Sequence, residues 1–130
     1  MMNEELKKTL RSRRICVVIP TYNNDKTIKA VVEKSLLYCD DVIVVADGCT
    51  DDTMDILHDI DNITLVSYPQ NKGKGYALKV GFRKALDKGV SYAITLDGDG
   101  QHYPENIPLF LKANQKHPHA LIVGSRQSMR

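Results

Sequence analysis

Short apolar runs rich in β-branched residues alternate along the chain with longer amphipathic stretches. Near-continuous apolar runs of this length are typical of strands that are buried on both faces of a parallel sheet. We therefore predict a mostly parallel sheet of about five strands, and we expect Pro20 to end the first of them. The five runs occupy residues 15–19, 41–46, 63–67, 92–96 and 120–123.

The stretches between these runs have the spacing of helices. Residues 26–37, 52–60 and 74–88 place apolar side chains three or four positions apart, which is the pattern of a helix with one buried face. Pro104 can open a fourth helix through residue 116, because proline is tolerated at the first helical position. Strand and helix thus alternate, and this order predicts an α/β fold: an open, doubly wound, Rossmann-like sheet with helices on both faces.

Composition narrows the class of protein. The chain has 130 residues, of which 42% are hydrophobic and 26% are charged, values typical of one soluble globular domain. A net charge of +2 and the absence of tryptophan argue against a nucleic-acid partner. The three cysteines form no even disulfide set, no apolar run is long enough to span a membrane, and the charged first residues lack the apolar core of a signal peptide. We expect the protein to be cytoplasmic, either in the cytosol or at the cytosolic face of a membrane.

Basic residues gather in residues 1–14, which we treat as a separate N-terminal segment. This segment could touch anionic lipid or phosphate in a peripheral membrane association, but the pattern favours the solvated start of a helix.

Two carboxylates, Asp97 and Asp99, follow the fourth apolar run within a glycine-rich turn. At ~4–5 Å and an effective dielectric constant of about 20, two such charges repel each other by roughly 3–4 kcal/mol. A cation between them would remove that repulsion, and Mg²⁺ or Mn²⁺ prefers carboxylate and amide oxygens. The amide oxygen of Gln101 could join the same ion. A solvated acidic turn is the alternative, since Asp-Gly pairs mark turns in many proteins.

Polar segments also follow the other predicted strands, and ligands of open α/β sheets bind outside the carboxyl ends of the strands. Asp47 could accept a hydrogen bond from a base or a ribose hydroxyl, or it could cap the next helix. Tyr22 could stack on a base or pack on the sheet. Residues 72–75 place two lysines and flexible amides at a helix start, which suits a diphosphate but is also ordinary loop composition. We expect Asp51 and Asp52 to serve the N-terminus of the second predicted helix, where negative charge is favourable.

Taken together, the four segments 19–23, 47–53, 71–75 and 97–105 resemble family 2 glycosyltransferases of the GT-A fold. The last segment, with residues 124–126, is most similar to the branch of polyprenyl (dolichyl) phosphate mannosyl- and glucosyltransferases. The resemblance covers nearly the whole chain, from about residue 15 to residue 126. Two positions depart from the pattern: Ala46 stands where many relatives have an aspartate before Asp47, and Cys49 stands where they often have serine.

The resemblance implies roles for matching residues. Asp97 and Asp99 would be the catalytic pair that holds Mg²⁺ or Mn²⁺ on the donor diphosphate, with Gln101 as a third metal ligand. Asp47 would bind the nucleoside. The other residues implied at the nucleotide are Pro20, Thr21, Tyr22, Asn23, Lys72, Gly73 and Lys74.

The resemblance also implies an activity: metal-dependent, inverting transfer of a hexose from a UDP- or GDP-sugar donor to an acceptor such as a lipid phosphate (polyprenyl phosphate) or a saccharide. Residues 15–130 would be the nucleotide-sugar-binding half of the domain, truncated before the acceptor-binding half and before the aspartate base of many relatives. We therefore expect binding of metal and nucleotide but poor turnover.

Three other functions compete with this interpretation. A sugar-phosphate nucleotidyltransferase shares the sheet and the metal chemistry, but it usually has a glycine-rich basic loop after the first strand, which residues 21–24 do not match. A phospho-acceptor receiver domain has its acidic pocket after strands one and three, whereas these carboxylates follow strands two and four. The third alternative, a non-catalytic nucleotide-binding module, is compatible with the sequence.

Overall fold

The computed structural model describes residues 2–100 and 104–116, built around a parallel sheet of four strands. The strands are β1 (Ile15–Thr21), β2 (Val42–Asp47), β3 (Thr64–Tyr68) and β4 (Tyr92–Thr95). The helical elements are α1 (Met2–Ser12), α2 (Ile28–Tyr38), α3 (Thr53–His58), α4 (Lys74–Asp87), the short 3₁₀ helix η1 (Pro104–Asn106) and α5 (Ile107–Lys116). The predicted α/β fold is confirmed, and the predicted fifth strand, 120–123, lies outside the described residues.

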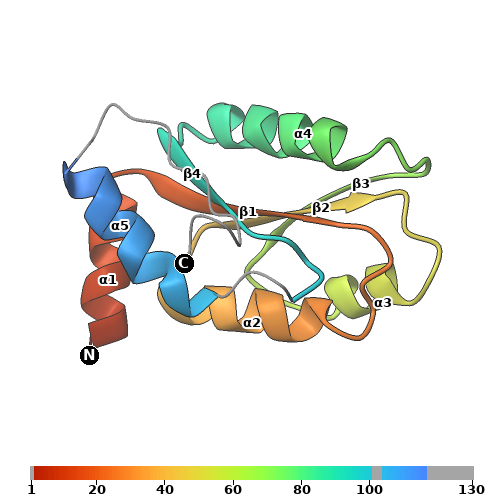
Figure 1. Ribbon diagram of the computed structural model, residues 1–130, viewed down its shortest axis with the longest axis horizontal. Helices are drawn as coiled ribbons and strands as arrows, with labels where there is room; N and C mark the ends of the chain where they lie inside the picture. The colour runs from red at the N-terminus through yellow and green to blue at the C-terminus, as the bar shows by residue number, and fades with distance from the viewer. Residues whose placement is uncertain (1, 101–103, 117–130) are drawn as a thin grey trace.

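The strand order is β3-β2-β1-β4, so β1 and β2 are central. Helix α4 covers one face of the sheet, while α2 and α3 cover the other, with α1 and α5 beside α2 (Figure 1). In β1, Val17 and Ile19 belong to the core cluster on the α2 side, and Cys16 and Val18 to the cluster on the α4 side. Burial on both faces therefore holds for the central strands, but it is wrong for β3, which is an edge strand and only partly buried.

Strand β1 continues through Pro20 to Thr21, so the prediction that Pro20 ends the strand is wrong. Pro20 pairs with Val45 and Thr21 with Ala46 of the neighbouring β2. The carbonyl of Pro20 faces the other neighbour, where it accepts a hydrogen bond from the Gly98 amide at 3.2 Å. In a strand the nitrogen of a residue lies on the same side as its carbonyl, so the proline nitrogen faces the segment after β4 and not β2. The missing N–H of proline therefore does not interrupt the ladder between β1 and β2.

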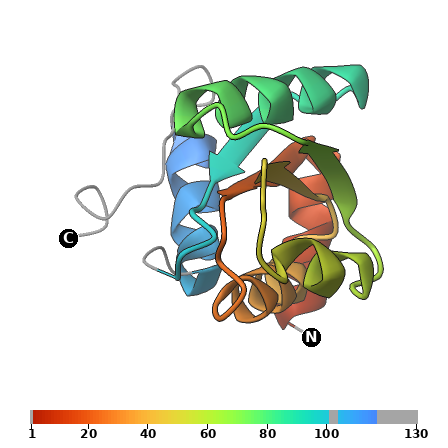
Figure 2. The same ribbon diagram turned by 90° about the vertical axis from the view of Figure 1, so that its right-hand side faces the viewer.

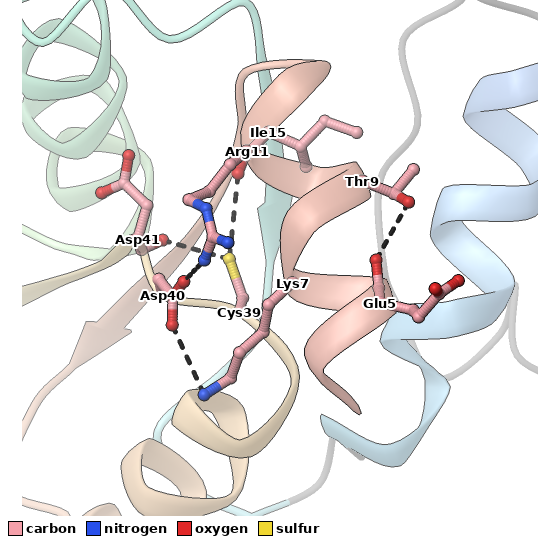
Figure 3. A network of polar contacts seen from close by, with 8 residues as sticks. All are labelled: Glu5, Lys7, Thr9, Arg11, Ile15, Cys39, Asp40 and Asp41. Carbon is pink, nitrogen blue, oxygen red and sulfur yellow. Dashed lines mark hydrogen bonds and ion pairs between the residues drawn. The ribbon is translucent and has the colours of Figure 1, made fainter. Parts of the chain in front are cut away.

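The basic N-terminal segment is a helix that packs on the domain. Leu10 of α1 is buried in the core. Lys7 Nζ lies 3.4 Å from Oδ1 of Asp40, and Arg11 pairs with the same carboxylate (Figure 3). Arg13 Nε donates to Oδ1 of Asn114 on α5 at 2.7 Å. The segment is therefore less solvated than its charge pattern predicted.

Candidate functional site

The carboxyl ends of β1, β2 and β4 meet the start of α4 around a groove of about 350 Å³. Figure 2 turns this edge of the sheet toward the viewer. The lining residues are Pro20, Thr21, Tyr22, Asn24, Asp47, Asn71, Gly73, Lys74, Ala77, Asp97 and Asp99. A second cavity of about 260 Å³, lined by side chains such as Phe82, Leu86 and Phe110, lies along β4 and has no charged lining residue. Of these two, only the first groove has charged side chains in its lining.

The groove brings together most of the residues that the sequence singled out. Asn23 and Lys72 do not line it, and Gln101 lies outside the described residues. Sequence reasoning missed Asn24, Asn71 and Ala77 as lining residues. Asn24 directly follows the segment 19–23, Asn71 lies in the segment 71–75, and Ala77 follows Lys74 by three positions, so it shares a helix face with Lys74.

Asp47 organises the loop before α4. Its side chain is buried, and its carboxylate accepts hydrogen bonds from the Lys72 amide at 2.8 Å, the Gly73 amide at 2.9 Å and Asn71 Nδ2 at 2.9 Å. Asp47 therefore does not cap α3, the next helix along the chain, and it holds the start of α4 at the end of β2 instead. Its contact with a nucleoside stays a prediction.

A different carboxylate serves α3. Asp51 Oδ1 accepts a hydrogen bond from the Thr53 amide at 2.9 Å, whereas the side chain of Asp52 makes no capping bond. Desolvation raises the pKa of Asp51, but hydrogen bonds from the backbone amides of Thr53 and Asp25 outweigh it and lower the pKa overall. Both carboxylates therefore lie at this helix N-terminus, as expected, but only Asp51 caps it through a side-chain hydrogen bond.

Gly48 allows the 70–73 loop to lie directly against the end of β2. Its φ is +66°, and a Cβ built on it would lie 2.1 Å from the backbone nitrogen of Asn71 and 2.4 Å from the backbone carbon of Gln70. No real side chain tolerates such distances. The closeness of this loop to Asp47 therefore depends on glycine at position 48.

Two asparagines shape the loop after β1. Asn23, at φ 51°, accepts a hydrogen bond from the Thr50 amide at 2.8 Å and donates to the Thr50 hydroxyl at 3.1 Å. Asn24 Oδ1 accepts from the Thr21 hydroxyl at 2.7 Å and from the Tyr22 amide at 3.2 Å. Asn23 thus joins the loops after β1 and β2 and shapes the rim of the groove without lining it.

Lys72 points to an aromatic pair outside the groove. Its Nζ lies 5.2 Å from the ring centroid of Tyr76, a cation–π contact. The ring of Tyr76 in turn meets Tyr68 edge to face, with centroids 5.3 Å apart. Burial raises the pKa of Tyr68, and the nearby carboxylate of Asp47 raises it further. Lys72 and Lys74 therefore have different surroundings, although the sequence treats them alike.

The acidic turn is pressed against the end of β1. The Thr27 hydroxyl donates to the Gly98 carbonyl at 2.7 Å, and a Cβ on Gly98 would lie 2.7 Å from Oγ1 of Thr21. This packing carries Asp97 and Asp99 into the groove lining. Asp99 is exposed and Asp97 is half-buried, so only Asp99 has the solvation of an ordinary surface turn.

Lys74 pairs with the first of these carboxylates. Its Nζ lies 2.8 Å from Oδ1 and 3.0 Å from Oδ2 of Asp97, so one ammonium group contacts both oxygens. Within residues 2–100 and 104–116, no group of three or more His, Cys, Asp and Glu side chains could hold a metal ion. The carboxylates that are left as candidate metal ligands are those of Asp97 and Asp99. Hard oxygen ligands that already attract one cation fit Mg²⁺ or Mn²⁺.

The helices that the structure describes include none with the length and apolar character needed to cross a membrane.

Comparisons with known proteins place the groove in context. The family model described as glycosyl transferase family 2 matches residues 16–129. The chain is 31% identical to a UDP-N-acetylglucosamine–dolichyl-phosphate N-acetylglucosaminyltransferase of Methanococcus voltae, over 90% of this chain and 53% of that protein. It is 32% identical to a polyprenol monophosphomannose synthase of Mycolicibacterium smegmatis, over 78% of this chain and 41% of the relative. The chain thus spans about half the length, or less, of these relatives.

Solved structures of other proteins share this fold. Glucosyl-3-phosphoglycerate synthase of Mycobacterium tuberculosis, in complex with Mn²⁺, UDP and phosphoglyceric acid, superposes with a TM-score of 0.63 at 27% identity, over 85% of this chain and 42% of that chain. A 4-diphosphocytidyl-2C-methyl-D-erythritol synthase superposes with a TM-score of 0.64 at 11% identity, over 81% and 56% of the two chains. The second likeness shows the fold alone, because enzymes of different families share this sheet.

Proposed function

Because this chain belongs to glycosyl transferase family 2, we propose that it is the donor-binding part of a metal-dependent, inverting glycosyltransferase that uses a UDP- or GDP-hexose. The observation that carries the proposal is the meeting of Asp97, Asp99 and Lys74 with the start of α4 in one groove. The groove volume of about 350 Å³ lies within the range of small-molecule sites. A structural neighbour with Mn²⁺ and UDP supports both the metal and the nucleotide.

The residues of the groove have complementary tasks in this proposal. Asp97 and Asp99 would hold Mg²⁺ or Mn²⁺, with Gln101 as a third ligand, and the ion supplies charge neutralisation for the diphosphate leaving group. The first turn of α4 directs amides and the positive end of the helix dipole to the same diphosphate. Asp47 keeps that turn in place through the amides of Lys72 and Gly73.

The nucleoside would lie over the ends of β1 and β2. Pro20, Thr21, Tyr22 and Asp47 line this part of the groove, and 47% of the surface of Tyr22 is exposed, so its ring is available to stack on a base. Oδ2 of Asp47 already accepts two of the hydrogen bonds from the loop before α4, whereas Oδ1 accepts one and keeps a second acceptor site. The buried carboxylate can therefore organise its loop and accept a hydrogen bond from the nucleoside.

For the acceptor we propose a polyprenyl phosphate, with a saccharide as the alternative. The names of two relatives, one acting on dolichyl phosphate and one a polyprenol monophosphomannose synthase, support this choice. A phosphate oxygen is already anionic near neutral pH, so it needs less help from a general base than a hydroxyl does. A lipid acceptor would bring the working enzyme to a membrane surface, and we propose peripheral association at the cytosolic face.

Titration of UDP- and GDP-sugars with and without Mn²⁺ by calorimetry tests the donor site. We expect binding that depends on Mn²⁺ and that weakens by about tenfold or more, equivalent to about 1.4 kcal/mol, in Asp99→Ala. Asp61→Ala is the matched control, because it removes an exposed carboxylate away from the groove. Equal affinity with and without Mn²⁺, unchanged in Asp99→Ala, would overturn the metal-dependent donor site.

A further inference from the structure

Lys74 holds Asp97 as a metal ion would. Its ammonium nitrogen contacts both carboxylate oxygens, at 2.8 and 3.0 Å, and it reaches them from the first residue of α4 across to the turn after β4. The side chain of Asp97 is 22% exposed and that of Lys74 is 57% exposed. The pair therefore lies at the mouth of the groove, where a ligand can separate it without opening the core.

A divalent ion and this ammonium compete for the same oxygens. A Mg²⁺ ion approaches carboxylate oxygens at about 2.0–2.1 Å, so on either oxygen of Asp97 it would lie close to Lys74 Nζ, which contacts both. Two cations so close together repel each other. Metal binding to Asp97 is therefore weakened while the ammonium stays and strengthened when it moves away.

An anion at the start of α4 would offer the ammonium another partner. Lys74 begins α4 and lies at the positive end of this 14-residue helix, where a diphosphate is favoured. An anion bound there would accept a charge-assisted hydrogen bond from Nζ. Donor binding and release of Asp97 are therefore coupled through one side chain.

We propose that Lys74 is a positioning residue that keeps Asp97 paired in the absence of donor and thereby makes tight metal binding depend on the donor diphosphate. The inference rests on the proposed function, because it assigns the order of events within the same groove. It predicts that metal alone binds weakly, and that metal and nucleotide strengthen each other.

A thermodynamic cycle measures this coupling. The dissociation constant of Mn²⁺ is measured by the paramagnetic signal of the free ion, without nucleotide and with saturating UDP or GDP, for the wild-type chain and for Lys74→Gln. We expect Lys74→Gln to bind Mn²⁺ alone about tenfold more tightly than the wild type, and the gain on adding nucleotide to fall by the same factor, within the usual range of coupling between sites.

Two variants act as controls. Lys79→Gln removes an exposed positive charge from the same helix, without a position in the groove, so we expect both constants to match the wild type. Lys74→Arg keeps a cation that can pair with Asp97, so metal alone should bind weakly, as in the wild type. Thermal unfolding checks that each variant is folded.

The outcomes separate the two proposals. If Lys74→Gln binds Mn²⁺ alone no more tightly than the wild type, while nucleotide binding still needs the metal, the role of Lys74 is refuted and the donor site stands. If neither chain binds Mn²⁺ together with nucleotide, the proposed function itself fails. A gain of equal size in Lys79→Gln would show a general charge effect and would also refute the inference.

Discussion

Replacement of Gly48 by alanine should disrupt the loop that carries Lys72 and Gly73. At φ +66° the new Cβ meets two backbone atoms of the loop at 2.1 and 2.4 Å. Backbone atoms cannot rotate away as a side chain can, so the 70–73 loop must shift. That shift would break hydrogen bonds that join the loop to Asp47, and it would move the first turn of α4 out of the groove.

The magnitude has two parts. A Cβ in the left-handed region costs about 1–2 kcal/mol, and overpacking against atoms that cannot yield adds about 1–3 kcal/mol. We therefore expect Gly48→Ala to lower the free energy of unfolding by about 2–5 kcal/mol. Gly89→Ala is the matched control: its φ is +78°, but a Cβ there meets nothing within 4 Å, so only the first part, about 1–2 kcal/mol, applies.

Urea denaturation of both variants gives the difference directly, and calorimetric titration of nucleotide with Mn²⁺ gives the effect on the groove. Gly48→Ala should be the less stable variant and should bind nucleotide more weakly, while Gly89→Ala should keep its nucleotide affinity. Equal destabilisation of the two variants, with equal nucleotide affinity, would refute the claim that the loop depends on close contact with Gly48.

Two further predictions concern packing and titration. Gly98→Ala should lower the free energy of unfolding by about 1–3 kcal/mol, because its Cβ would lie 2.7 Å from Oγ1 and 2.8 Å from Cβ of Thr21. If the variant is as stable in urea as the wild type, β1 moves to admit the methyl group and the prediction is wrong. Burial raises the pKa of Cys16 to about 12 and of Cys39 to about 11, from an ordinary value of 9.0. The unfolded chain therefore ionises these thiols first, so stability should fall as the pH rises from about 9 towards 11. Urea midpoints at pH 8 and pH 10 check this, and Cys39→Ala should reduce the fall; a midpoint that does not change contradicts it.

The order of elements follows from local pattern. Residues 15–19 of β1 and 42–46 of β2 are apolar at every position, and this continuous pattern is what a strand with helices on both faces requires. The pattern could not show that β3 lies at the edge, because strand order depends on pairing between distant segments. It also could not show that β1 passes through Pro20, since that depends on which neighbour the proline nitrogen faces.

At the site, the sequence by itself determined which chemical groups follow which strand, because Asp97 and Asp99 are neighbours along the chain and Asp47 directly ends an apolar run. Only the tertiary structure decided the partners of these groups. Asp47 binds amides about 25 residues away, and Asp97 pairs with Lys74 across 23 residues. Such contacts arise because parallel strands bring their carboxyl ends to one edge, and no spacing within a single segment encodes which side chains then meet.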